Sequence, residues 1–473
     1  MKNIFALLVI FLVAFSAKAA VKLPAIFSDN MVLQQQIDAP IWGWAKGGAS
    51  VEVTTSWNGK SYSTTANKEG EWKIKVATPE AGGPFQIEIN DGEALTLDNV
   101  LIGEVWLCSG QSNMEMPLKG FPAQPVKGGN EAIVNGKNSS VRLITVPRNA
   151  TIETTQDFEG QWEVAKPSTV SEFSATAWFF GTQLYRALDV PIGLVHVSYG
   201  GSNIEAWMSK EMLEDFKDEI EIPETKEDFG DPNRTATALY NGMLHPVIGY
   251  GIKGAIWYQG ESNYDRPFQY EELMVTMVDE WRKEWGMGEF PFYYAQIAPF
   301  NYGMFTPDRV IEKNNSAYLR EAQQKAGKRI PNSGMAVLMD IGEKNNIHPA
   351  DKKAGGHRLA YWALAKTYGL EGFEYSSPTF EAMEIKGSTV VVAFDNVPNG
   401  ITSYGKEVKS FEIAGEDKRF YPATAELRRK SILLSSPHVS DPVAIRYAFK
   451  DFVVGEVFST GGLPLSSFRT DDW

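Results

Sequence analysis

The chain has little cysteine, little histidine and too little basic charge to balance its acids. Its single cysteine, Cys108, cannot form a disulfide within one chain, so the fold must be stabilised by its apolar cores. Lys and Arg number 45 against 59 Asp and Glu, which gives a net charge of −14. The sequence also contains no basic run and no Cys/His spacing typical of zinc sites. These absences argue against a nucleic-acid partner, an anionic membrane surface and a metal site.

Long apolar runs are absent beyond the first residues. Residues 1–3 carry a lysine, residues 4–15 are apolar, and residues 17–19 read Ala-Lys-Ala, an order typical of a secretory signal. We predict a signal peptide over 1–19, because the apolar stretch is too short for a typical membrane span. No cysteine follows it that could accept a lipid. The mature protein is therefore expected to be exported to a bacterial periplasm or cell surface, with no membrane span after signal cleavage.

The remaining chain divides into three regions. Residues 20–103 hold short β-rich segments separated by Gly-containing turns, a pattern typical of a β-sandwich. Over 104–370, apolar strands alternate with helical stretches, which predicts a three-layer α/β domain with a parallel sheet. Residues 371–473 return to strand character and predict a second β-sandwich region. The sequence leaves open whether the two β regions pack together.

A candidate nucleophile follows the apolar, strand-like run 105–108. The run ends in Gly110-Gln111-Ser112-Asn113, a small and polar turn. In α/β folds the reacting groups gather at the carboxyl ends of the strands, and a glycine there lets the backbone turn sharply enough to expose a side-chain oxygen. Ser112 is therefore the candidate serine nucleophile.

Five histidines are available as a base for this serine. His348 follows the strand-like run 334–339 and precedes Pro349, which suits the first position of a helix. This places His348 at the same strand-end rim as Ser112, and an imidazole can take a hydroxyl proton near neutral pH. His196 lies within an apolar run and is expected to be a hydrogen-bonded core residue. The other histidines are His245, His357 and His438.

Two further strand ends carry polar groups. The segment 194–203 contains the pair Gly200-Gly201, where backbone N–H groups can approach a ligand closely. The segment 254–263 ends in amide and carboxylate groups. A single polar strand end is common by chance. Four in one chain, carrying a serine, a glycine pair, amides and a histidine, are much less common. Their combination favours a catalytic rim over ordinary loops.

Five motifs occur in a fixed order along the chain. They are Gly-Gln-Ser-Asn-Met (110–114), Gly-Gly-Ser-Asn-Ile-Glu-Ala-Trp (200–207), Leu-Tyr-Asn-Gly-Met-Leu-His-Pro (239–246), Trp-Tyr-Gln-Gly-Glu-Ser-Asn (257–263) and Ile-His-Pro-Ala-Asp-Lys-Lys (347–353). This order resembles the sialate O-acetylesterases, a branch of the SGNH hydrolases. The resemblance implies a metal-independent, cofactor-free esterase that removes O-acetyl groups from sialic acid or related carbohydrates.

The resemblance also implies a role for each matching residue. Ser112 would be the nucleophile and His348 the general base. The oxyanion hole would combine backbone N–H groups with one side-chain amide, drawn from Ser112, Gly200, Gly201, Gln259 and Asn263.

The sequence departs from the family pattern three residues before the histidine. SGNH hydrolases usually have an aspartate there, whereas this chain has Asn345, and an amide cannot supply the charge that stabilises imidazolium. Either another carboxylate substitutes, or a backbone carbonyl orients a Ser–His dyad. We favour the dyad and interpret Glu261 as a loop-pinning residue. The candidate acids are Asp340, Glu343 and Glu261, and the candidate carbonyls belong to Asn345 and Asn346.

Three other functions compete with this interpretation. An acetylxylan-type esterase would share Ser112 and His348 but act on a different sugar. A non-catalytic glycan-binding protein would use the β regions and release no acetate. A glycosidase would need two carboxylates flanking the scissile bond, and the available acids are Glu205, Glu261 and Asp340.

Overall fold

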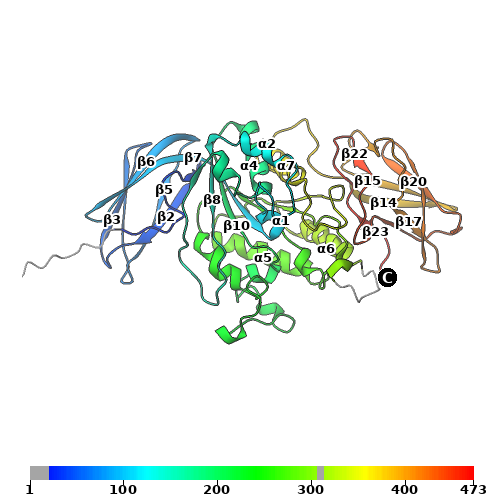
Figure 1. The fold of residues 1–473 in the computed structure, drawn as a ribbon, viewed down its shortest axis with the longest axis horizontal. Coiled ribbons are helices and arrows are strands. Elements are labelled where there is room, and N and C mark those ends of the chain that lie inside the picture. The colour runs from blue at the N-terminus through cyan, green and yellow to red at the C-terminus, as the bar shows by residue number, and fades with distance from the viewer. Residues whose placement is uncertain (1–20, 306–313) are drawn as a thin grey trace, which may run out of the picture.

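The computed structural model describes residues 21–305 and 314–473. The predicted signal peptide over 1–19 therefore lies outside the described residues. Figure 1 shows an elongated molecule in which an α/β region occupies the middle and β-rich regions lie at the two ends.

A sheet with the strand order β13-β12-β11-β7-β10-β8-β9 forms the centre of the molecule. Neighbouring strands in this order are parallel, except that β9 pairs antiparallel with β8 at one edge. The strands are β7 (Ala94–Gly110), β8 (Asn138–Thr145), β9 (Glu163–Ala165), β10 (Ile192–Ser198), β11 (Gly254–Tyr258), β12 (Phe292–Ala295) and β13 (Ser333–Ala336).

Helices cover both faces of this sheet because its strands are apolar on both sides. Along β7, Val105 and Leu107 share a core with α5 and α6, whereas Trp106 and Cys108 share the opposite core with α4 and α7. The helices are α1 (Ser112–Glu115), α2 (Gly129–Val134), α3 (Pro167–Val170), α4 (Ala175–Leu188), α5 (Tyr270–Trp285), α6 (Asn315–Arg329) and α7 (Lys352–Trp362). The predicted three-layer α/β fold with a parallel sheet is confirmed.

Strand β7 links the central sheet to the N-terminal β region. It runs for 17 residues, and its first half pairs with β6 and β1 while its second half pairs with β10 and β11. The predicted domain boundary at 103 thus lies within one continuous strand. In the central sheet β7 lies between β10 and β11, so the chain crosses to opposite sides of it. Such a switch point is where α/β sheets open a ligand crevice, and Ser112 follows directly after it.

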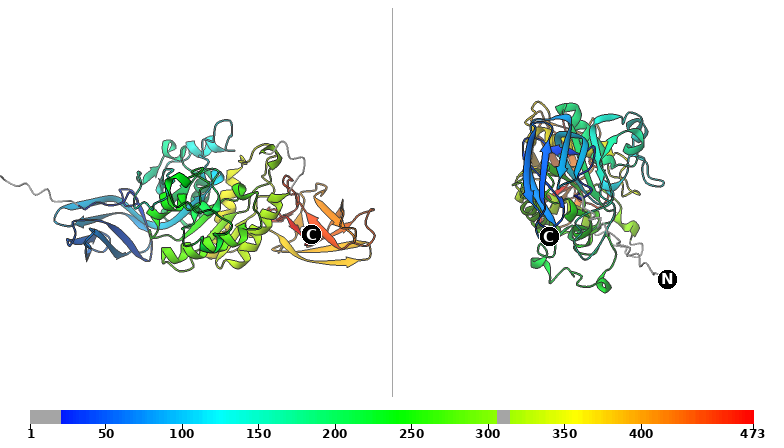
Figure 2. Two further views of the ribbon diagram at one scale, coloured as in Figure 1. Left: turned by 90° about the horizontal axis from the view of Figure 1, so that it is seen from below. Right: turned by 90° about the vertical axis from the view of Figure 1, so that its left-hand side faces the viewer.

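The β regions form separate bodies at opposite ends of the molecule (Figure 2). The N-terminal strands are β1 (Val32–Gln34), β2 (Asp38–Trp44), β3 (Ser50–Thr55), β4 (Lys60–Thr65), β5 (Glu71–Ala77) and β6 (Gly82–Asn90). The C-terminal strands are β14 (Thr379–Lys386), β15 (Thr389–Asp395), β16 (Ile401–Thr402), β17 (Phe411–Ala414), β18 (Phe420–Pro422), β19 (Thr424–Leu427), β20 (Ser431–Ser435), β21 (Ala444–Tyr447), β22 (Phe458–Ser459) and β23 (Phe468–Arg469). Two four-stranded C-terminal sheets share one apolar core.

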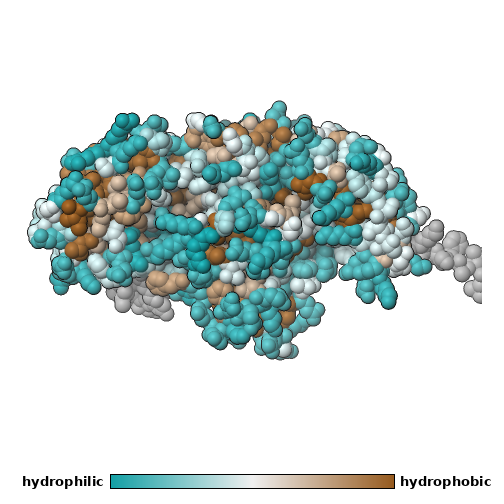
Figure 3. Space-filling model, turned by 180° about the vertical axis from the view of Figure 1, so that it is seen from behind, coloured by the Kyte–Doolittle hydropathy of each residue, from teal (hydrophilic) through white to brown (hydrophobic). Residues whose placement is uncertain are grey.

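Short helical turns complete the connections between these elements. The 3-10 turns are η1 (Ile204–Trp207), η2 (Glu214–Phe216), η3 (Lys226–Asp228), η5 (His245–Val247), η6 (Glu261–Asn263) and η7 (Tyr302–Phe305), and the π turns are η4 (Tyr240–Leu244) and η8 (Ala363–Thr367). Within the described ranges, no helix is both long enough and apolar enough to cross a membrane. The face drawn in Figure 3 is mostly hydrophilic, with apolar residues in small scattered groups.

Candidate active site

Ser112 lies at a sharp turn between β7 and the short helix α1. Gly110, the last residue of β7, has φ +142°, and a Cβ there would lie 2.1 Å from the Tyr258 carbonyl oxygen of the neighbouring strand β11. Only glycine fits this close approach. The side chain of Gln111 then fixes the turn, because its Oε1 accepts hydrogen bonds from the backbone N–H groups of Gly260 and Ser262. The turn therefore holds Ser112 at the strand-end rim, as predicted.

His348 contacts Ser112 directly. Its Nε2 lies 2.8 Å from Ser112 Oγ, although the two residues are 236 positions apart in the chain. The backbone N–H of His348 donates to Asn346 Oδ1, and the ring of Phe121 packs edge-on against the imidazole at a centroid distance of 5.3 Å. These contacts fix the imidazole beside the serine hydroxyl in the geometry that a general base needs.

Gln124, a residue that the sequence analysis missed, holds the other side of the imidazole. Its Oε1 lies 2.5 Å from His348 Nδ1. With the amide oxygen as acceptor, Nδ1 carries the proton and Nε2 is free to accept the proton of Ser112. The orienting group is thus a neutral side-chain amide from the loop between α1 and α2. It is neither a carboxylate nor a backbone carbonyl of Asn345 or Asn346.

Burial keeps His348 neutral. The pKa of His348 is lowered to about 4, chiefly by burial and secondly by the charge of nearby Lys352. A neutral imidazole is the form that can accept a proton, so the base is ready across the neutral pH range.

The other proposed orienting residues have different partners. The Asp340 carboxylate forms a two-bond pair with the Arg358 guanidinium, with both distances 2.7 Å. Glu343 accepts from the backbone N–H of Ala350 and from Asn346 Nδ2, so it closes its own loop. Asn345 is exposed. The structure therefore corrects the expected dyad with a local carbonyl, since these residues shape the loop while Gln124 contacts the ring.

Asn113 connects the serine turn to the histidine loop. Its Nδ2 donates to Glu261 Oε1 at 2.6 Å and to the carbonyl oxygen of Ile347, the residue before His348. Its Oδ1 accepts from Lys352 Nζ at 2.5 Å. The amide is fully buried, so both of its ends are satisfied by side chains and backbone of the site. Glu261 thus acts on the loops through Asn113, as interpreted from the sequence.

Two buried charges flank this amide. Burial lowers the pKa of Lys352 to about 7, while the carboxylates of Glu261 and Glu343 oppose that shift. Burial also raises the pKa of Glu261, whose Oε2 has no hydrogen-bond partner among the described residues. These two charges therefore contact Asn113, whereas the hydrogen bonds of the imidazole go to the neutral side chains of Ser112 and Gln124.

The predicted oxyanion amide of Gln259 is engaged elsewhere. Both Nε2 hydrogens of Gln259 have acceptors, the Ser202 carbonyl oxygen at 2.9 Å and Asn263 Oδ1 at 2.7 Å. Asn263 in turn donates to Glu205 Oε2 at 2.9 Å. These bonds tie the loop after β10 to the loop after β11. In this arrangement Gln259 has no free N–H for an oxyanion.

Gly200 lies beside Ser112, and its backbone N–H already has an acceptor. A Cβ at Gly200 would lie 3.3 Å from Ser112 Cβ, so a side chain there would crowd the site. Its N–H, however, donates to Glu115 Oε2 at 2.9 Å, and Arg148 binds the same carboxylate through two hydrogen bonds of 2.6 Å. No acceptor for the N–H groups of Ser112 and Gly201 occurs among the hydrogen bonds of the described residues.

The arrangement of acids does not suit a glycosidase. Glu205 is buried and binds Arg266, Asn203 and Asn263. Glu261 and Asp340 are held by the partners described above. Each of these three candidate acids is thus held by neighbouring groups, which does not suit the acid pair of glycoside hydrolysis. Nor do His, Cys, Asp and Glu residues cluster as a metal site within ranges 21–305 and 314–473.

Comparison with known proteins identifies carbohydrate esterases as relatives of this chain. Residues 102–363 match the family described as carbohydrate esterase, sialic acid-specific acetylesterase. The chain is 28% identical to the sialate O-acetylesterase of Mus musculus, covering 94% of this chain and 92% of the relative. The human sialate O-acetylesterase is also 28% identical, over 92% and 88% of the two chains. A crystal structure of a carbohydrate acetylesterase from Xanthomonas citri is 35% identical and superposes with a TM-score of 0.87, covering 96% of this chain and all of the other.

The SGNH-like core and these similarities define an ester hydrolase that acts on acetyl esters. More particularly, the chain belongs to the sialic acid-specific acetylesterase family of carbohydrate esterases, whose substrates are acetylated carbohydrates.

Proposed function

We propose that the protein is a sialate O-acetylesterase that works through Ser112 and His348. The observation that carries the proposal is the 2.8 Å contact between Ser112 Oγ and His348 Nε2, with Nδ1 of the same ring held by Gln124. A hydroxyl, a neutral imidazole and an orienting acceptor in line are the parts of a serine esterase.

The reaction follows from this geometry in two halves. Ser112 Oγ attacks the acetyl carbonyl carbon while His348 Nε2 takes the hydroxyl proton. The tetrahedral intermediate then breaks its bond to the sugar oxygen, which receives that proton from His348 and leaves as a hydroxyl group. Water attacks the acetyl-enzyme with His348 as base, and acetate leaves as the Ser112 hydroxyl is restored. Gln124 supplies orientation without charge, so the imidazolium is stabilised less than by a triad aspartate.

We assign the oxyanion hole to the backbone N–H groups of Ser112 and Gly201. Both belong to turns at the carboxyl ends of neighbouring strands β7 and β10, and their lack of intramolecular acceptors supports the assignment. Backbone donors of this kind are typical of acyl-transfer enzymes. Gly200 keeps the space beside Ser112 free of a side chain.

Arg148 supports a negatively charged sugar as the substrate. Arg148 and Ser112 both lie close to Gly200. A Cβ atom placed on Gly200 would be 3.3 Å from Ser112 Cβ and 3.6 Å from Arg148 Nη2. Glu115 takes the Nε–H and one Nη2–H of the guanidinium, which leaves three donors for a second carboxylate. The guanidinium also stacks on the Tyr199 ring at 4.6 Å, which keeps it in place at the rim.

We also propose that the enzyme is exported and works in a bacterial periplasm or at the cell surface. The charged, apolar and small-residue order of residues 1–19 supports this location. Scavenging acetylated glycans outside the cytoplasm fits such an enzyme.

The test is acetate release from O-acetylated sialic acid and from acetylated xylan, measured side by side with and without a metal chelator. We expect faster release from the sialic acid and no loss of activity with chelator. Nitrophenyl esters of increasing chain length should show a steep fall beyond about four carbons, because the family acts on the small acetyl group. Faster release from xylan would instead identify an acetylxylan-type esterase, and no release from any ester would contradict the enzyme assignment.

A further inference from the structure

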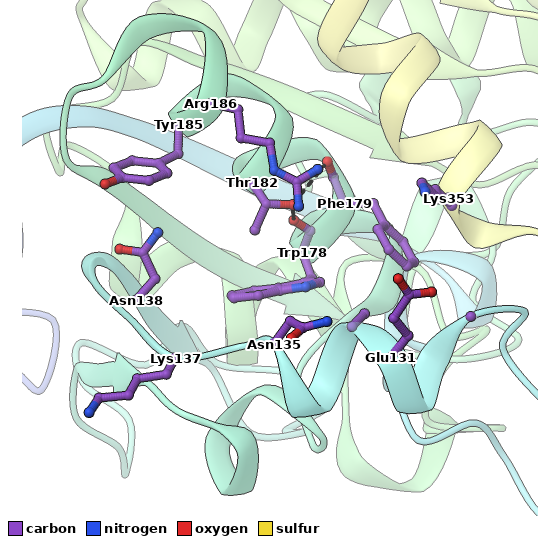
Figure 4. A pocket seen from close by; sticks show the side chains of 12 residues that line it. Glu131, Asn135, Lys137, Asn138, Trp178, Phe179, Thr182, Tyr185, Arg186 and Lys353 are labelled. Carbon is purple, nitrogen blue, oxygen red and sulfur yellow. Dashed lines mark hydrogen bonds between the residues drawn. The ribbon is translucent and has the colours of Figure 1, made fainter.

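A second concave site lies on the surface formed by α2 and α4, away from the Ser112 turn. Figure 4 shows it from close by, with Trp178, Phe179 and Tyr185 of α4 around its centre. Its volume is about 290 Å³. Small-molecule sites span roughly 300–1,000 Å³, so this pocket suits a ligand of about one sugar ring. Ser112, His348 and Gln124 are not among its lining residues.

The rim of the pocket gathers positive charge. Lys137, Arg186 and Lys353 line it together with a single acid, Glu131. All four side chains belong to exposed residues, and none of them forms an ion pair with a residue that the structure describes. This excess of cations stands out in a chain with a net charge of −14. A local positive field on an acidic protein attracts small anions selectively.

Half-buried His357 lies next to Phe179, one of the aromatic residues that line the pocket. Its ring lies 6.2 Å from that of Phe179. The pKa of His357 is lowered to about 4, first by burial and then by the charges of Lys353 and Arg186, while the Asp351 carboxylate opposes the shift. Two cations carried by different helices, α7 and α4, therefore outweigh the one nearby carboxylate at a point beside Phe179.

We propose that this pocket binds one acidic sugar residue, a uronic or sialic acid. The aromatic side chains offer apolar faces to the C–H groups of a sugar ring. Arg186 offers paired donors to its carboxylate, while Lys137 and Lys353 lie at other sides of the rim and add to the positive field. The amides of Asn135 and Asn138 also line the pocket and can bind hydroxyl groups.

Such a site holds a glycan without cleaving it. A chain bound at the pocket through one acidic residue keeps its other residues near the enzyme, which raises their effective concentration at the catalytic serine. The pocket therefore adds a retention function to the esterase and does not depend on which acetyl ester is cleaved.

The experiment compares D-glucuronate with D-glucose, which differ only in the carboxylate. Saturation-transfer NMR titrations of the full chain give the two dissociation constants at low salt. We expect glucuronate to bind more tightly, and the double variant Arg186→Gln/Lys137→Gln to weaken its binding at least about fivefold while glucose is unaffected. Added salt should weaken glucuronate binding in the same direction.

A matched double variant controls for the general loss of charge. Lys386→Gln/Lys409→Gln removes two exposed lysines from the C-terminal β region, each of which has a neighbouring glutamate. It should leave glucuronate binding unchanged. The variant Tyr185→Leu removes one aromatic face and should weaken both sugars, and thermal unfolding checks that each variant is folded. Equal affinity for the two sugars, or equal glucuronate binding by the two double variants, would overturn the proposal.

Discussion

Two serine–histidine pairs lie at the carboxyl ends of neighbouring strands. Ser112 Oγ is 2.8 Å from His348 Nε2, and Ser198 Oγ is 2.5 Å from His196 Nε2. Ser198 pairs in register with Gly110, two residues before Ser112. Burial lowers the pKa of both histidines to about 4. A short contact and a neutral imidazole therefore do not by themselves identify a catalytic pair.

The surroundings of the two pairs differ. His196 and Ser198 belong to one strand, are 4% and 3% exposed, and lie under the ring of Phe173. Ser112 lies in a turn and is partly exposed, and its histidine comes from a distant loop. Nδ1 of His348 has an amide acceptor at 2.5 Å, whereas Nδ1 of His196 has only the Thr145 hydroxyl at 3.4 Å. Access and orientation separate a reactive serine from a structural one.

The largest expected difference in activity is between variants of the Ser112–His348 pair and a variant of the Ser198–His196 pair. Ser112→Ala and His348→Ala should each reduce kcat/KM on an aryl acetate about a thousandfold or more, because each removes a group that reacts. Ser198→Ala should reduce it by less than about tenfold, since that hydroxyl only satisfies a buried histidine. Initial rates and thermal unfolding of the three variants measure this difference.

The opposite pattern would reverse the assignment. A collapse of turnover in Ser198→Ala, with normal unfolding and near-normal activity of Ser112→Ala, would place the reaction at the buried pair. Equal partial losses in both serine variants would mean that neither hydroxyl is the nucleophile.

The second largest effect concerns Gln124, whose amide oxygen lies 2.5 Å from Nδ1 of His348, closer than the Thr145 hydroxyl lies to Nδ1 of His196. Gln124→Ala should lower kcat roughly ten- to a hundredfold, less than loss of a triad aspartate, because the amide supplies orientation without charge. Gln124→Glu places a negative charge on the ring and should raise the pKa of His348. The acid limb of the kcat/KM profile should then move to higher pH, because imidazolium forms earlier as the pH falls.

Rate–pH profiles of the wild type and both variants provide the measurement. Unfolding curves establish that the loop between α1 and α2 is intact. A Gln124→Ala variant with wild-type kcat and an unchanged profile would leave His348 oriented by its own loop, as the sequence alone suggested.

The sequence predicted the strand ends better than the loops that meet there. The apolar runs before Ser112 and His348 are long enough to read as strands, and parallel strands bring their carboxyl ends together, so the pair could be predicted. Gln124 lies in an irregular loop twelve residues after Ser112, where no periodicity or spacing rule relates it to the histidine. For the same reason the sequence could not show that the N–H of Gly200 donates to Glu115, a residue of the helix α1 that begins at Ser112.

A third, smaller effect tests the charge behind the pair. Lys352 lowers the pKa of His348, so Lys352→Met should raise it. His348 must be neutral to act as a base, and activity is lost as the pH falls through its pKa, so the acid limb should move up by about one pH unit or less. Above pH 7 the wild-type amine is itself largely neutral, because its pKa is about 7, and the two profiles should converge.

Lys127→Met is the matched control for this charge. Lys127 is exposed and pairs with Asp351 at the start of α7. The substitution therefore removes one positive charge from the surface of the same region. Its profile should overlay that of the wild type. An equal shift in both variants would indicate a general loss of positive charge, and no shift in either would remove Lys352 from the control of the base.

The smallest effect on turnover comes from Asp340, one of the candidate acids that the sequence offered for the triad. Asp340→Asn should reduce kcat/KM by less than about tenfold, because the carboxylate binds Arg358 and not the imidazole. It should instead destabilise the fold by about 1 to 3 kcal/mol, since Arg358 is buried and would lose a two-bond partner. Arg358→Met should lower the unfolding temperature similarly, which links the loss to the ion pair. A thousandfold fall in turnover at an unchanged unfolding temperature would instead show that Asp340 reaches His348 during the reaction, and would make the neutral arrangement seen here a resting state.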